Sequence, residues 1–220
     1  ENENYVASSD SANFTVFKAP SNVTVNVDDV TYDAVVGVNV TVVNVTAVTY
    51  TLKYANGTVI EENVTISDLT KDLTFALGAG NYTITVVNKN TTNITGSQAS
   101  RNFTVRKAKS AVNSSDVVEV YGVNATVTIS SVNATSVNVT VLDKDNNTVY
   151  SNASALANGN VVLPILAAGN YTIKLTTNPL NGNYSVGFNE YKLTIVKSNS
   201  SVVIGEIANV TYPDATMINF

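Results

Sequence analysis

Hydrophobic and polar residues alternate in short runs along most of the chain, and this pattern predicts β-strands. In residues 22–27 the valines take one face and the polar residues take the other, and the same period of two recurs in 38–42, 126–129 and 137–141. The segment 161–166 contains a proline, which fits only an edge strand or a bulge, so its inward face stays open. No stretch of useful length has the period of an amphipathic helix. The pattern therefore predicts an all-β protein.

Turn signals separate the predicted strands. Tyr50, Leu52 and Tyr54 form the expected inward face of one strand, and the Asn56-Gly57 pair that follows is a strong hairpin signal. Residues 143–147, Asp-Lys-Asp-Asn-Asn, supply the corresponding turn later in the chain. Short strands joined in this way are typical of a β-sandwich.

The chain contains an internal repeat. Three segments resemble one another, at 14–18, 103–107 and 193–197, and they are spaced by 89 and 90 residues. The sequence Ala-Gly-Asn-Tyr-Thr-Ile occurs at 79–84 and again at 168–173, with the same spacing of 89. Because two independent landmarks share one period, the repeat unit is expected to be about 90 residues, the size of an immunoglobulin-like domain.

The repeat predicts tandem immunoglobulin-like β-sandwich domains of the Greek-key type. Repeat 1 covers residues 19–107 and repeat 2 covers 108–197. Residues 1–18 are interpreted as the terminal strand of a preceding repeat, and 198–220 as the opening strands of a following one. The chain is thus interpreted as part of a longer array, with neighbouring repeats of the same chain as its partners.

Tyr82 and Tyr171 occupy the place of the tyrosine corner, in which a hydroxyl bonds back to the backbone before the penultimate strand. We interpret both as structural residues. Farther along, the loop from Asn178 to Glu190 carries Tyr184 and Phe188, which are candidate ligand contacts. This loop lies at the pole that faces the preceding repeat, so packing against a neighbouring repeat is favoured over ligand binding, and both stay open.

Several of these segments resemble the immunoglobulin-like repeats of adhesin-like surface proteins from archaea, particularly methanogens. The resembling motifs are Ala-Gly-Asn-Tyr-Thr-Ile, Asn-Gly-Asn-Tyr at 181–184, Leu-Thr-Ile-Val-Lys at 193–197, and Val-Ile-Gly-Glu at 203–206 with Pro-Asp-Ala-Thr at 213–216. The resemblance implies a large, extracellular, cell-surface-anchored adhesive protein, with the anchor outside this segment. It leaves contact with a host or neighbouring cell surface open. Repeat 1 lacks the Asn-Gly-Asn-Tyr motif in its last loop.

Composition excludes several functions. With a net charge of −5 and no Lys/Arg cluster, the chain has no surface that could follow a nucleic-acid backbone. No apolar run is long enough for a bilayer, so this segment is expected to make no membrane contact. The absence of Cys and His excludes thiol nucleophiles, catalytic triads and most zinc sites. We therefore expect no enzyme, no catalytic residues and no cofactor.

Acidic residues offer little further chemistry. The adjacent pairs Asp28-Asp29 and Glu61-Glu62 are interpreted as solvated loop residues, because neighbours in a strand face opposite ways and do not converge on one substrate. The run Asp143-x-Asp145-x-Asn147 resembles the start of a calcium loop but lacks the sixth-position glycine and the closing glutamate. A hairpin turn is the preferred interpretation, and no metal site is expected.

Asn-x-Ser/Thr triplets are in excess. Random order would give roughly seven of these acceptor sites for N-linked glycans. The chain has twenty candidate asparagines: Asn13, Asn22, Asn39, Asn44, Asn56, Asn63, Asn81, Asn90, Asn93, Asn102, Asn113, Asn124, Asn133, Asn138, Asn146, Asn152, Asn170, Asn183, Asn199 and Asn209. Strand alternation generates some of them, but asparagine is a poor strand former and several triplets fall in predicted loops. Glycans would also shield the edges of a charge-poor sheet.

The sequence as a whole predicts a structural stalk that displays a distal adhesive region of a large glycosylated surface protein. Two alternatives remain. The repeats themselves could bind a surface carbohydrate or protein ligand through loops, or the chain could be a subunit of an S-layer, filament or virion fibre.

Overall fold

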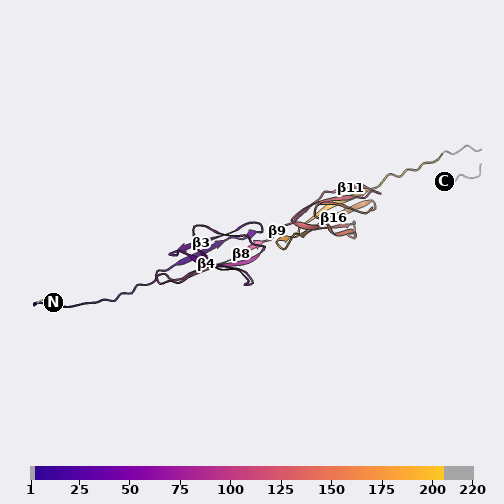
Figure 1. Cartoon of the computed structure of the whole chain (residues 1–220). Helices are drawn as coiled ribbons and strands as arrows, with labels where there is room; N and C mark the ends of the chain where they lie inside the picture. The colour runs from indigo at the N-terminus through magenta and orange to yellow at the C-terminus, as the bar shows by residue number, and fades with distance from the viewer. Residues whose placement is uncertain (1–2, 206–220) are drawn as a thin grey trace, which may run out of the picture. The chain divides into compact units, whose positions relative to one another are not determined.

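The computed structural model describes residues 3–205, which contain β-strands and no helix. Among these residues there is accordingly no helix that could cross a membrane. The chain divides into two compact units (Figure 1). Unit 1 comprises the residues up to Ala111 together with Val132–Thr135 and Thr177–Gly187, and unit 2 comprises the remainder. The candidate Asn209 and most of the expected opening strands of a following repeat lie outside the described residues.

A three-stranded and a five-stranded sheet form the sandwich of unit 1. Their strand orders are β1-β3-β6 and β2-β8-β7-β4-β5. The pairings are antiparallel except for β2, which runs parallel to β8. The strands are β1 (Asn22–Val27), β2 (Val30–Thr31), β3 (Val36–Val43), β4 (Val48–Tyr54), β5 (Val59–Ile66), β6 (Leu73–Phe75), β7 (Gly80–Asn88) and β8 (Ser97–Arg106).

A second pair of sheets repeats this topology. The orders are β10-β12-β15 and β11-β18-β16-β13-β14, and again the short strand β11 runs parallel to its neighbour β18. A separate two-stranded parallel sheet joins β9 to β17. The strands are β9 (Ala108–Lys109), β10 (Ala111–Asn113), β11 (Val117–Val120), β12 (Thr126–Val132), β13 (Ala134–Leu142), β14 (Thr148–Leu156), β15 (Gly159–Val162), β16 (Gly169–Pro179), β17 (Tyr184–Ser185) and β18 (Phe188–Val196).

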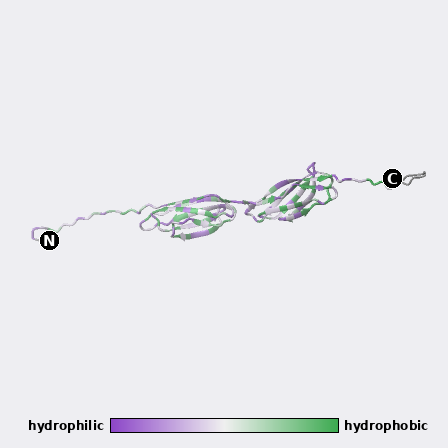
Figure 2. Ribbon diagram, turned by 90° about the horizontal axis from the view of Figure 1, so that it is seen from above, coloured by the Kyte–Doolittle hydropathy of each residue, from purple (hydrophilic) through white to green (hydrophobic). Residues whose placement is uncertain are grey.

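The core of unit 1 follows from strand alternation. Val23 and Val25 of β1 are buried between exposed polar neighbours, and Leu52 is fully buried at the centre of β4. Figure 2 shows hydrophobic and hydrophilic residues alternating along the strands. One expected inward residue differs: Tyr54 is 43% exposed because β4 ends there, and its ring contacts that of Tyr82 with centroids 5.2 Å apart. The prediction of an all-β sandwich is confirmed.

The second core is built in the same way. Val137, Val139 and Val141 of β13 are fully buried, and Ile173 and Leu175 of β16 continue the inward face. Residues 161–166, whose inward face the sequence left open, belong partly to a strand and partly to the connection after it. Strand β15 lies at the edge of its sheet and ends before the proline, while the next residue, Leu163, is buried and donates its backbone N–H to Ala125 O over 2.8 Å.

Both predicted turns are present. Gly57 adopts φ +90° between β4 and β5, where an L side chain would be strained. Asp143 donates its backbone N–H to Asn147 O over 3.0 Å between β13 and β14. These hairpins fix the antiparallel pairing of the two strands at one edge of each five-stranded sheet.

The edge strands β5 and β14 both carry a bulge. The register of β4 with β5 shifts on either side of Leu52, beside Asn63, which has φ 53°. The register of β13 with β14 shifts between Val137 and Val139, beside Asn152. A bulge bends the strand and interrupts the row of edge hydrogen-bonding groups.

Candidate functional site

The two tyrosine corners form from the residues that the repeat identified. The Tyr82 hydroxyl donates to Gly78 O over 2.6 Å, and the Tyr171 hydroxyl donates to Ala167 O over 2.8 Å. The settings differ, because Tyr82 is 1% exposed whereas Tyr171 is half-buried. Burial is the main cause that raises the pKa of Tyr82, and neighbouring Tyr54 adds to it. Both hydroxyls are engaged in holding the turn before the penultimate strand.

The loop that carries Tyr184 belongs to compact unit 1. Tyr184 is buried, meets the Tyr32 ring edge-on with centroids 5.4 Å apart, and donates its hydroxyl to Asp33 Oδ2 over 3.1 Å. Desolvation, then the Asp33 carboxylate, raise the pKa of this hydroxyl. Beside it, Asn183 Oδ1 accepts the backbone N–H of Ala79 over 2.8 Å. With these contacts Tyr184 is only 8% exposed.

Phe188 is the other candidate contact of this loop and belongs to unit 2. It begins β18, pairs with Thr176 and is 58% exposed. Its ring is therefore accessible, whereas Tyr184 is buried.

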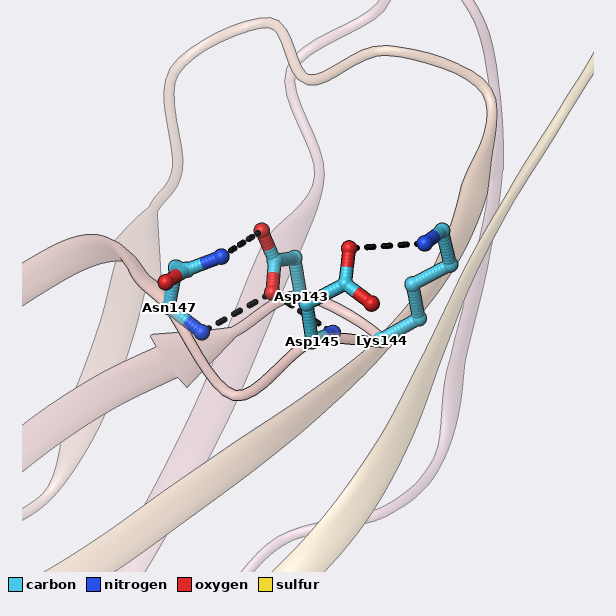
Figure 3. A network of polar contacts seen from close by, with 4 residues as sticks. All are labelled: Asp143, Lys144, Asp145 and Asn147. Atoms are coloured by element: carbon cyan, nitrogen blue, oxygen red, sulfur yellow. Dashed lines mark hydrogen bonds and ion pairs between the residues drawn. The ribbon is translucent and has the colours of Figure 1, made fainter.

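The calcium-like sequence is a self-contained turn (Figure 3). Asp143 Oδ1 accepts the backbone N–H groups of Asp145 and Asn147, both over 2.9 Å, and Oδ2 accepts Asn147 Nδ2 over 3.2 Å. The Asn147 hydrogen bonds are the main cause that lowers the pKa of Asp143. Lys144 Nζ forms an ion pair with Asp145 over 2.7 Å. The carboxylates thus serve the turn, and residues 3–205 contain no group of three acidic side chains that could hold a metal.

The expectation for Glu61 and Glu62 was partly wrong. They lie in strand β5 rather than in a loop, with Glu62 exposed and Glu61 half-buried. Glu61 accepts a hydrogen bond from the Tyr50 hydroxyl. Burial, and then this carboxylate, raise the pKa of Tyr50 to about 12. Sequence reasoning missed the pair because the bulge in β5 brings Glu61 opposite Leu52, next to Tyr50.

The Asp28-Asp29 pair lies in the connection between β1 and β2, and both residues are exposed. Asp29 Oδ1 accepts the backbone N–H of Thr104 over 2.8 Å, and Oδ2 pairs with Arg106 over 2.7 Å. Exposed ion pairs of this kind contribute little stability. Here the carboxylate holds the end of β8 in place.

The described sequon asparagines are all at least partly accessible. Most are exposed, including Asn13, Asn90, Asn113 and Asn199 in segments outside the sheets or at their ends. Four are half-buried: Asn133, Asn138, Asn152 and Asn183. In several others the side-chain nitrogen that a glycan would occupy already donates a hydrogen bond, as in Asn124 to Leu163 O over 2.7 Å and Asn44 to Pro20 O over 2.9 Å. Accessibility therefore differs from site to site.

Two sequons of unit 1 pair with each other across β7 and β8. Thr83 Oγ1 donates to Asn102 Oδ1 over 2.8 Å, and Thr104 Oγ1 donates to Asn81 Oδ1 over 3.0 Å. Each sequon threonine thus bonds to the asparagine of the other sequon. The bond leaves the side-chain nitrogens of these asparagines directed elsewhere, so a structural use of the Asn–Thr pair and glycan attachment are compatible.

Comparisons with known proteins give no match to the sequence and only distant likenesses to solved structures. No family model and no curated protein matches the sequence. Among solved structures, the chain is similar to the fibronectin(III)-like modules of Clostridium thermocellum CbhA, with 13% identity, 84% of this chain and 100% of that one covered, and a TM-score of 0.34. The chain is also similar to the titin domains Z1Z2 in complex with telethonin, with 15% identity, 83% of this chain and 100% of that one covered, and a TM-score of 0.42. For a two-domain fibronectin type-III segment of chicken tenascin the identity is 14%, the coverage is 78% of this chain and 97% of that one, and the TM-score is 0.42. At these identities and TM-scores the likenesses carry no further conclusion, and the all-β sandwich rests on the strand order of the sheets themselves.

Proposed function

We propose that this chain is a spacer segment of a large, glycosylated, extracellular adhesin-like protein, in which tandem immunoglobulin-like repeats display a distal adhesive region. The observation that carries the proposal is the exact recurrence of strand order in the two pairs of sheets. The recurrence of one topology supports a repeated structural unit. The proposed boundaries are 19–107 and 108–197.

The segments that flank these repeats support a longer array. Phe14 and Val16 are 88% and 81% exposed, whereas Phe103 and Val105, at the equivalent places of repeat 1, are buried. At the other end Val202 is 89% exposed, while its equivalent Val112 is buried in a core. Core-type residues that are exposed in both flanking segments are what partial repeats would present.

The connection between the two repeats is short and hydrogen-bonded. Strand β8 ends at Arg106, and Ala108 and Lys109 already pair with β17. Buried Ser110 then shares a hydrogen bond of 2.5 Å with Thr177 and donates to Ser185 O over 2.6 Å. A connection this short has little slack when the chain is pulled, which suits a spacer.

Single-molecule force spectroscopy of the full chain tests the spacer function. If the repeats are independent modules, stretching gives two separate unfolding events, each releasing about 300 Å of chain for about 90 residues. Intact-mass measurement of native material tests the glycans, because a mass equal to the polypeptide alone contradicts them. One unfolding event covering the whole chain would contradict the tandem arrangement.

Binding assays distinguish the spacer from a ligand-binding module. The unmodified chain, applied to a glycan array and to whole cells, is expected to show no binding above that of a Phe188→Ala variant. Saturable binding that is lost in Phe188→Ala would favour the alternative in which the repeats themselves recognise a surface ligand. Burial of Tyr184 already removes one of the two candidate contacts from the exposed surface.

A further inference from the structure

The loop before β18 occupies a defined seat in unit 1, which we call the loop seat. It consists of four residues: Tyr32, Asp33, Gly78 and Ala79. Tyr184 packs on the Tyr32 ring and donates its hydroxyl to Asp33, while Asn183 accepts the N–H of Ala79. A Cβ added at Gly78 would come within 3.0 Å of Asn183 Oδ1, so the fit is close. The seat therefore recognises an Asn-Tyr dipeptide by shape and by two hydrogen bonds.

Unit 2 has residues equivalent to Tyr32 and Asp33. The backbone N–H of Tyr32 is donated to Arg106 O over 2.8 Å, just after β2, and that of Tyr121 is donated to Val196 O over 2.8 Å, just after β11. The next residues both adopt a positive φ, 77° at Asp33 and 96° at Gly122. Tyr121 and Gly122 thus hold the same backbone positions in the second sandwich.

The tyrosine corners show that Gly78 and Ala79 also have equivalents in unit 2. Gly78 and Ala167 supply the carbonyls that accept the hydroxyls of Tyr82 and Tyr171. The residues that follow, Ala79 and Ala168, begin the repeated Ala-Gly-Asn-Tyr sequence. The four positions of the loop seat are therefore all reproduced in unit 2.

Three of these four equivalent residues line an open pocket. Its walls are Tyr121, Ala167, Ala168, Lys197 and Ser198, and its volume is about 400 Å³. Tyr121 is 51% exposed there, whereas Tyr32, beneath Tyr184, is half-buried. Tyr121 and the two alanines form a small apolar surface on which a side chain from another segment can pack.

We propose that this pocket is a second loop seat, which receives the loop before the last strand of a further immunoglobulin-like repeat that follows Lys197 in the same chain. The inference rests on the proposed function, since it needs the array to continue. Its partner is defined by chemistry: a loop with an asparagine that accepts the N–H of Ala168, followed by a side chain that lies on Tyr121.

The connecting segment provides the argument for a repeat in the same chain. In unit 1, Ala108 and Lys109 pair with Tyr184 and Ser185, so the seated loop is fixed to the residues that enter its own repeat. Repeat 1 has the equivalent pairing between its entering residues and its last loop, because Ala19 pairs in parallel with Ile94. Ser198 stands in the place of Ala19 and Ala108, directly after the repeated Lys197, and it lines the pocket. A loop paired to Ser198 would therefore be delivered to Tyr121.

The second seat differs at two positions. Ala167 replaces Gly78, so a seated asparagine must shift by a few tenths of an ångström to clear the added Cβ. Gly122 replaces Asp33, and this second difference selects the occupant. Asp33 accepts the Tyr184 hydroxyl, but Gly122 has no side chain to replace it. A tyrosine in the second seat would bury a hydroxyl that lacks this acceptor, which is unfavourable. An apolar residue at this place needs no hydrogen-bond acceptor. The chain contains a loop in which an apolar residue follows asparagine, Asn93-Ile94-Thr95. The second seat thus favours an Asn-Ile type of loop over Asn-Tyr.

Disulfide trapping tests the proposal in a chain that has no native cysteine. Residues 19–107 are appended directly after Lys197, and the protein is produced without glycans. Ala168→Cys is combined with Asn93→Cys in the added repeat, and Ala79→Cys with Asn183→Cys in the original chain is the reference. Seating predicts that the Ala168 pair oxidises at least about tenfold faster than a mismatched pair that uses Val118→Cys, because docking raises the effective concentration of the two thiols.

Further variants test the preference of the second seat for an Asn-Ile loop, and three different outcomes would contradict the proposal. Ile94→Tyr in the added repeat is expected to slow trapping, and Gly122→Asp is expected to restore it by supplying the acceptor. A folded third repeat, shown by its dispersed amide spectrum, without faster trapping would overturn the seat and leave the tandem array intact. A third repeat that stays unfolded would overturn the repeat boundaries and the seat together. Disulfide-linked dimers in place of internal bonds would assign the pocket to a second copy and refute a partner in the same chain.

Discussion

Replacing the corner tyrosines by phenylalanine is expected to have unequal effects in the two sandwiches. Tyr82→Phe removes a 2.6 Å hydrogen bond from a hydroxyl that is almost fully buried, and it leaves the half-buried Gly78 carbonyl without that donor. A lost hydrogen bond costs about 0.5–1.5 kcal/mol, and a buried unsatisfied carbonyl adds to it, so we expect about 1.5 kcal/mol. Tyr171→Phe removes the 2.8 Å bond to exposed Ala167, whose carbonyl water can reach, and we expect about 0.5 kcal/mol.

Urea titration of the full chain, followed by the amide resonances of each sandwich, measures the two free energies of unfolding separately. The denaturant slope should stay unchanged, because neither variant alters the surface exposed on unfolding. The melting temperature of the first sandwich should fall by about 4–8 °C for each kcal/mol lost. A Tyr171→Phe cost that equals or exceeds the Tyr82→Phe cost would show that solvent access to the carbonyl does not set the strength of the corner.

Three further outcomes are expected. Gly187→Ala should destabilise the chain by about 2 kcal/mol, because its Cβ would lie 2.4 Å from the backbone oxygen of Ser110. Gly182→Ala is the control and should be neutral, since nothing lies within 4 Å of the added Cβ. Equal melting temperatures for the two variants would contradict this expectation. Since the folded state holds the pKa of Tyr50 at about 12, above its ordinary value of 10, its stabilisation is complete below pH 10 and is lost as pH rises to 12. Unfolding measured across this range should therefore show a steeper decline in the parent chain than in Tyr50→Phe, where the raised pKa values of Tyr82 and Tyr184 still contribute, and parallel curves would refute it. In a host that performs N-glycosylation, glycopeptide mass spectrometry should find Asn146, at an exposed turn, occupied more fully than Asn124, whose side-chain nitrogen is bonded; the reverse order would count against hydrogen bonding as the control.

The strands could be predicted from the sequence because their signals are local. Alternation within a few residues placed Val23 and Val25 inward, and the Asn56-Gly57 pair specified its hairpin without reference to any distant residue. The tyrosine positions followed from a motif that the chain contains twice. These features depend on the period of the backbone, which the sequence displays directly.

Contacts that depend on register or on distant segments could not be predicted. The bond between Tyr50 and Glu61 requires the bulge in β5, and a shift of one residue would move Glu61 to the other face. The seating of Tyr184 requires Asp33, which lies 151 residues earlier in the chain. Even the sequon excess was only partly explained by alternation, because the reciprocal bonds of Thr83 and Thr104 give asparagine a use in strands that its intrinsic propensity does not show.

The bulges at Asn63 and Asn152 bear on how an array of domains with the same topology avoids misassembly. Adjacent repeats are tethered at high local concentration, so an unpaired edge strand of one could zip onto the matching edge of its neighbour during folding. Each bulge falls on the edge strand of a five-stranded sheet, β5 or β14, and breaks the straight ladder that such zipping needs. Since both bulges coincide with sequons, a glycan added there before folding is complete would block the same edge a second time. The array would then owe its fidelity to irregularities in its edge strands.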